Sequence, residues 1–175
     1  MQKIILIIIV LLSMIFNSCS LAGPHMTERL FDTDNDVANA HMDKILEALE
    51  NGDKESIKAM FSENAIAVAD DFDKSVDELF EYYEGEYTSY EDGGMSTENA
   101  YSDGEEQQIF DLSYDVTTSV REYRFSVLEY ITDDADPDNE GIWSLYIIKM
   151  EDDPQPEYSY RGDGKRTPGI HIGLN

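Results

Sequence analysis

The sequence predicts an α+β domain in which N-terminal helices pack on an antiparallel sheet. Apolar residues recur at helical spacing between Asp36 and Tyr83. After Glu86 the spacing changes to the two-residue alternation of strands. A chain of 175 residues with this single change of pattern suits one domain rather than two.

Three helices are expected, each with its own start or stop signal. The first ends at Asn51-Gly52, because glycine readily adopts the left-handed conformation that closes many helices. Asp53 is then the expected N-cap of a short second helix, and Gly85 ends the third. The apolar stripes of the three helices are predicted core positions: Ala38, Met42, Ile45, Leu46 and Leu49; Ile57, Met60 and Phe61; Phe72, Val76, Leu79, Phe80 and Tyr83. Residues 65–69 are expected to form a short extended connection.

The strand region contains one weak run and three strong ones. Residues 87–90 predict a weak first strand, and the polar residues 91–107 predict a long loop with room for one more short strand. Strong alternation predicts strands over 108–119, 122–132 and 141–150. The last of these is apolar on both faces and is therefore placed centrally in the sheet. Residues 133–140 are expected to form a hairpin loop, and 169–172 to close the chain against the sheet.

The first residues predict a leader and not part of the fold. Lys3 precedes an apolar run, Ile4 to Phe16, that is short for a membrane span but fits a secretory signal peptide. The run ends in Asn17-Ser18-Cys19, which resembles a bacterial lipobox and implies cleavage before Cys19 and a lipid on its sulfur. An ordinary signal peptide is the alternative. The expected organisation is a lipoprotein signal peptide over 1–18, a tether over 19–31 and a single domain over 32–175, anchored at the extracellular face of the cell membrane.

Charge and cysteine content exclude several classes of protein. The chain carries 38 acidic and 12 basic residues, a net charge of −26. Such a field repels the phosphates of nucleic acids and favours cations or basic partners. Cys19 is the single cysteine, and with only three histidines the usual zinc sites lack ligands. No nucleic acid, metal or cofactor is therefore expected.

Two acidic runs have the alternating spacing that calcium ligands can have. Asp32, Asp34 and Asp36 lie at alternate positions, as carboxylates that ligate a hard cation can. A second run has the same spacing: Asp134, Asp136 and Asp138. Neither run has the glycine and glutamate that complete an EF-hand loop, so acidic loops are the favoured interpretation.

Several motifs resemble a known superfamily over about residues 37–150. They are Leu49-Glu50-Asn51-Gly52-Asp53, Met60-Phe61-Ser62, Leu79-Phe80-Glu81-Tyr82-Tyr83-Glu84-Gly85, Val116-Thr117-Thr118 with Tyr123-Arg124, and Gly141-Ile142-Trp143-Ser144-Leu145. With the order of elements, they resemble the nuclear transport factor 2-like (cystatin-like cone) superfamily and, within it, a family of uncharacterised lipoproteins of Gram-positive bacteria. The resemblance implies a cone-shaped domain with a curved antiparallel sheet, and it implies no assigned activity.

In that superfamily a pocket lies between the first helix and the concave face of the sheet. The residues expected to reach it are His41, Tyr83, Tyr87, Tyr114, Tyr123 and Trp143. Aromatic rings can stack on a ligand and their hydroxyls can hydrogen-bond it, which favours non-catalytic capture of a small molecule or peptide. Core packing of the same rings is the structural alternative. A protein-interaction or homodimerisation module using the sheet face is the second functional hypothesis. An isomerase or dehydratase is less expected, because no spacing selects an acid–base pair, and no catalytic residue is named.

Overall fold

The computed structural model of the protein describes residues 34–153 and 165–173. The chain divides into two compact units, Met1–Val37 and Ala38–Asn175, and only residues 34–37 of the first are described. Cys19, the predicted leader and the predicted tether lie outside the described residues.

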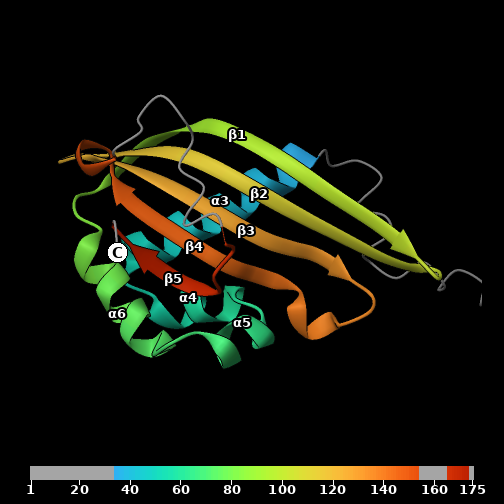
Figure 1. Cartoon of the computed structure of the whole chain (residues 1–175). Helices are drawn as coiled ribbons and strands as arrows, with labels where there is room; N and C mark the ends of the chain where they lie inside the picture. The colour runs from blue at the N-terminus through green and yellow to red at the C-terminus, as the bar shows by residue number, and fades with distance from the viewer. Residues whose placement is uncertain (1–33, 154–164, 174–175) are drawn as a thin grey trace, which may run out of the picture. The chain divides into compact units, whose positions relative to one another are not determined.

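The described residues form four α-helices and five strands. The helices are α3 (Asp34–Asn51), α4 (Lys54–Met60), α5 (Glu63–Val68) and α6 (Phe72–Tyr82), with the short 3-10 helices η2 (Pro137–Asn139) and η3 (Met150–Asp152). The strands are β1 (Tyr87–Ser102), β2 (Glu105–Thr118), β3 (Glu122–Asp133), β4 (Gly141–Lys149) and β5 (Gly169–Ile172). Figure 1 shows α3 to α6 on one face of a curved sheet. The predicted α+β class is confirmed.

The sheet has the strand order β1-β2-β3-β4-β5. Its first three pairs are antiparallel, as expected, whereas β5 pairs with β4 in parallel. β4, predicted to be central, is an interior strand flanked by β3 and β5, whereas the middle position belongs to β3. The consecutive β4 residues Leu145, Tyr146, Ile147 and Ile148 are all buried, which explains the absence of a polar face.

The turn between α3 and α4 forms as its sequence predicts. Gly52 has a φ of +67°. Its N–H donates to the Leu49 carbonyl at 3.2 Å, and the N–H of Asp53 donates to the Ala48 carbonyl at 2.9 Å. These two bonds satisfy carbonyls that the end of α3 leaves open. Asp53 caps α4 by accepting from the Ser56 N–H at 3.0 Å.

The predicted extended connection over 65–69 is wrong, because residues 63–68 form α5. Ser62 is its N-cap, and the hydroxyl of Ser62 accepts from the Ala65 N–H at 3.1 Å. Alanine is the strongest helix former, so the alternating alanines of this stretch were compatible with a helix. The signal that should have decided between helix and strand is Ser62 followed by Glu63.

The predicted long loop over 91–107 is also wrong. β1 continues to Ser102, which pairs with Glu105 of β2. The turn is Asp103-Gly104, with φ values of +55° and +92°, and such a pair is a strong two-residue hairpin signal. Most side chains of this edge strand are exposed, so its sequence did not need the apolar alternation that marks a half-buried strand.

The core lies between the helices and the sheet. Its largest fully buried side chains include Tyr123 and Phe125 of β3, Phe110 of β2, Met42 of α3 and Leu79 of α6. The core positions predicted on α3 are buried without exception. Within the described part of the chain, no helix combines the length and the apolar character needed to cross a membrane.

Candidate functional site

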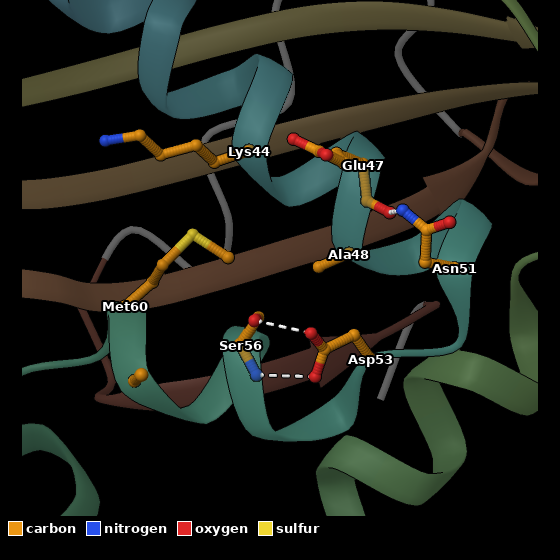
Figure 2. Close-up of a pocket in the computed structure, with 8 residues that line it drawn as sticks. Lys44, Glu47, Ala48, Asn51, Asp53, Ser56 and Met60 are labelled. Atoms are coloured by element: carbon orange, nitrogen blue, oxygen red, sulfur yellow. Dashed lines mark hydrogen bonds between the residues drawn. The ribbon is translucent and has the colours of Figure 1, made fainter.

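A surface groove lies between α3 and α4 (Figure 2). It has a volume of about 330 Å³, near the lower end of the roughly 300–1,000 Å³ typical of small-ligand sites. Its lining residues are Lys44, Glu47, Ala48, Asn51, Asp53, Ser56, Ala59 and Met60. The groove was not among the sites expected from the sequence.

The α3 wall of the groove follows from helical spacing. Lys44, Glu47, Ala48 and Asn51 lie three, four and seven residues apart, which puts them on one side of the helix. The Asn51 amide donates to the Glu47 carbonyl at 2.8 Å and so stays against the end of its own helix. This wall therefore has three charged or polar residues and one small apolar residue, Ala48.

The α4 wall is fixed by the cap at its start. The two carboxylate oxygens of Asp53 accept from the N–H and the hydroxyl of Ser56, at 3.0 and 2.6 Å. These hydrogen bonds lower the pKa of the Asp53 carboxyl below its ordinary value, so the group is ionised at neutral pH. Ala59 and Met60 supply apolar surface from the far end of α4.

A histidine–carboxylate pair lies one turn before Lys44 on α3. His41 Nδ1 lies 2.8 Å from Oε2 of Glu129 on β3, and the two side chains are 30% and 9% exposed. The pair joins α3 to the sheet. Glu129 was missed as a site residue. Its signal was that it ends an otherwise apolar series on one strand face, after Tyr123, Phe125 and Val127.

Two of the expected tyrosines meet α3 at the β1–β2 side of the sheet. Tyr114 is buried, and its hydroxyl donates to the Asn39 side chain at 3.2 Å. Burial and the nearby charge of Asp92 raise the pKa of Tyr114 above its ordinary value. Tyr87 is 38% exposed, and its N–H donates to the Glu50 carboxylate at 2.9 Å.

Two others pack on each other at the C-terminal end of α6. Tyr83 stacks on Tyr123, with ring centroids 5.4 Å apart. The Tyr123 hydroxyl accepts from the Glu84 N–H at 2.8 Å and donates to the Tyr82 carbonyl at 3.0 Å. Tyr123 is fully buried, and burial is the main cause of its raised pKa. Both bonds of its hydroxyl go to the protein's own backbone.

Trp143 lies apart from the other expected site residues. Its ring packs against that of Tyr130, with ring centroids 5.8 Å apart. Its indole N–H donates to the Arg166 carbonyl at 2.7 Å. Tyr130 follows Glu129 on β3, and successive side chains of a strand point to opposite faces. Because Glu129 contacts α3, the Trp143–Tyr130 pair lies on the sheet face that points away from α3.

The second acidic run folds around a single buried carboxylate. Asp133 accepts from the Asp136 N–H, the Gln107 amide and the Asn139 amide, at 2.9 to 3.2 Å. Asp136 in turn accepts from the Asn64 amide at 3.0 Å. Among residues 34–153 and 165–173, no group of three or more histidine, cysteine or acidic side chains is placed to hold a metal ion. Asp32, from the first run, lies outside the described residues.

Replacing Asp133 with asparagine is expected to lower the free energy of unfolding by about 1–3 kcal/mol at pH 7, because an amide cannot accept all three bonds. Burial alone would raise the pKa of the Asp133 carboxyl, but hydrogen bonds from Asn139, Gln107 and the backbone outweigh it and lower the pKa. A lowered pKa gives stability that is complete above the ordinary carboxyl value of 3.8 and is lost as pH falls through the folded-state pKa.

Urea unfolding from pH 7 to pH 3 tests this expectation. The difference between the wild type and Asp133→Asn should be constant near neutrality and shrink below about pH 4. Asp138→Asn removes the same charge from an exposed position of the same loop and is the matched control. A difference between wild type and Asp133→Asn that persists unchanged to pH 3 would contradict the role of the ionised carboxylate.

Most of the described residues match the model of one protein family. Residues 44–150 match a family model described as "Domain of unknown function (DUF5104)". The match runs from the groove residue Lys44 to the residue after β4, and so it includes both walls of the groove and Glu129. No curated protein matches the chain.

Proposed function

The chain belongs to the family of the domain of unknown function DUF5104, and from this premise we propose that it is a non-catalytic binding domain that captures a small molecule or a short peptide in the α3–α4 groove. The observation that carries the proposal is the groove itself, in which both walls combine polar or charged groups with apolar side chains. Ligand sites combine apolar surface with polar groups that orient the ligand, and here Ala48, Ala59 and Met60 supply the apolar part.

The groove is favoured over the aromatic interior as the binding site. Tyr114 and Tyr123 are buried, and their hydroxyls already bond to Asn39 and to the backbone. A ligand there would have to displace packed rings at a cost of several kcal/mol. The groove requires no displacement, because its volume is open in the structure.

We further propose that the domain is a nuclear transport factor 2-like cone held at the extracellular face of the cell membrane by a lipid on Cys19. Support comes from the leader-like run before Cys19, and from helices packed on one face of a curved sheet. The intact mass of the protein extracted from membranes tests the anchor. A mass larger by a diacylglyceryl group than that of residues 19–175 is expected, and a bare polypeptide mass would contradict it.

Native mass spectrometry of the gently purified protein tests the binding proposal. A retained non-protein mass is expected, and Ala59→Trp should abolish it by filling the groove from an exposed position of α4. Ala67→Trp places the same ring on an exposed position of α5 and is the matched control. A retained mass that both variants keep would place the ligand elsewhere, and a dimer with nothing bound would favour the interaction module instead.

A further inference from the structure

Lys44 differs from every other lysine and arginine within residues 34–153 and 165–173. It is the one such residue for which the structure gives no hydrogen bond or ion pair. The others each have a partner: Lys54, Lys58, Lys74, Arg121, Arg124, Lys149, Lys165 and Arg166. Because acidic residues outnumber basic ones by 38 to 12, an unpaired ammonium group in a groove is unexpected.

Glu47 lies three residues after Lys44 and lines the same groove, yet the two do not form an ion pair among the described contacts. Lys58 and Glu55 have the same spacing in α4 and do pair, at 3.6 Å. The order differs, since the acid precedes the lysine in α4 and follows it in α3. The order alone does not prevent pairing, since Lys74 precedes Glu78 in α6 and the two form an ion pair at i,i+4. The groove is thus lined by a lysine and a glutamate whose side chains have no ion-pair partner among the described residues.

The apolar part of the groove lies beside these charges. Figure 2 shows the side chains of Lys44 and Met60 at one end of the groove, with Ala48 in the middle and Asn51 and Asp53 at the other end. A ligand that follows the groove thus meets an ammonium group, apolar surface and carboxylates.

We infer that the groove takes a zwitterionic ligand, in the class of free amino acids and short peptides with free termini; this rests on the proposed binding function. The carboxylate of the ligand binds Lys44 Nζ, its ammonium group binds the Glu47 carboxylate, and its side chains contact Ala48, Ala59 and Met60. The net charge of −26 argues against a simple anion, because the field of the whole molecule repels it. A zwitterion carries no net charge and meets a complementary partner at each end.

Trialanine and its blocked forms are the probes. Amide chemical shifts of the ¹⁵N-labelled full chain in detergent micelles report both the site and the affinity. Trialanine is expected to shift amide signals of Ala48, Asn51 and Ala59. N-acetyl-trialanine amide, which lacks both charges, should bind more weakly by up to about 25-fold, since it loses two ion pairs that contribute up to about five-fold each.

Single variants assign each terminus to its partner. Lys44→Gln should raise the Kd of trialanine about five-fold. The same variant should leave the Kd of trialanine amide unchanged, because that ligand has no carboxylate. Glu47→Gln should raise the Kd of trialanine by a similar factor, and that loss should vanish for N-acetyl-trialanine. Lys74→Gln removes the same charge from an exposed position of α6 and should leave every Kd unchanged.

Each other outcome overturns a defined part of the argument. Groove shifts with Kd values insensitive to Lys44→Gln and Glu47→Gln would overturn the zwitterion class and leave the groove as a binding site. An absence of groove shifts up to millimolar trialanine would overturn the class as well. In that case, a retained mass that disappears in Ala59→Trp would still support the groove as a binding site. If the wild type retains no mass either, both the proposed function and the zwitterion class are overturned.

Discussion

Replacing Arg124 with methionine is expected to lower the free energy of unfolding by about 3–5 kcal/mol. Arg124 is 6% exposed and lies on β3. Its Nε and Nη2 donate to the two oxygens of Asp115 at 2.7 and 2.8 Å, and its Nη1 donates to Asp153 at 2.9 Å. The Asp153 side chain is only 1% exposed. The variant would remove the Arg124 charge from beside that buried carboxylate.

Equilibrium unfolding in urea, extrapolated linearly to water, measures the loss. Adding Asp153→Asn to Arg124→Met should restore part of it, because the buried negative charge is then removed as well. Arg121→Met is the matched control, since Arg121 also bonds two carboxylates, Glu84 and Glu151, but those are 46% and 68% exposed. Equal losses in the two single variants would contradict the importance of burial.

Replacing Tyr123 with alanine is expected to cost about 3–5 kcal/mol, as for other large aromatic residues removed from a core. The ring is fully buried and lies against Tyr82, Tyr83 and Phe125, with centroids 5.9, 5.4 and 6.5 Å away. Tyr123→Phe keeps the ring but leaves the Glu84 N–H without its acceptor, and about 1–3 kcal/mol is expected.

The same two variants decide between the core and the binding interpretations of the aromatic cluster. If the cluster is core, the midpoint of urea unfolding falls while the native mass spectrum of the folded fraction keeps any bound mass. Tyr87→Ala, at a position 38% exposed, should change the midpoint much less and is the control. A ligand lost from Tyr123→Phe at unchanged stability would return the aromatic interior as the binding site.

The parts of the fold that the sequence predicts correctly are those with local causes. The end of α3 follows from Gly52, and the start of α4 follows from Asp53, because the bonds involved join residues at most five apart. β1 was missed beyond residue 90 because the pairing of an edge strand depends on its neighbour rather than on its own apolar pattern. Its Asp103-Gly104 turn was the local signal that could have shown it.

The site was less predictable, because its contacts join residues that are far apart in the sequence. His41 was expected to reach the interior, but its partner Glu129 lies 88 residues away, and only the packing of α3 on β3 brings them together. Trp143 was expected in the same hollow, yet it contacts Tyr130 on the other face of the sheet. The sequence also did not reveal the α3–α4 groove. Lys44 and Lys74 both lie on helices with a glutamate three or four residues later, but only Lys74 pairs with that glutamate in the structure.

The parallel pairing of β5 with β4 has a consequence for folding kinetics. β5 contacts α6 as well as β4, and the N–H of Gly173 donates to the Ile147 carbonyl at 2.8 Å. Residues near 80 and near 170 must therefore meet before this part of the core closes. Contacts between residues so distant in sequence require the chain to lose loop-closure entropy before the favourable contacts form. Such contacts therefore slow folding. Only Gly52 and Asp53 separate α3 from α4, so the turn between these two helices can form much earlier than β5 docks.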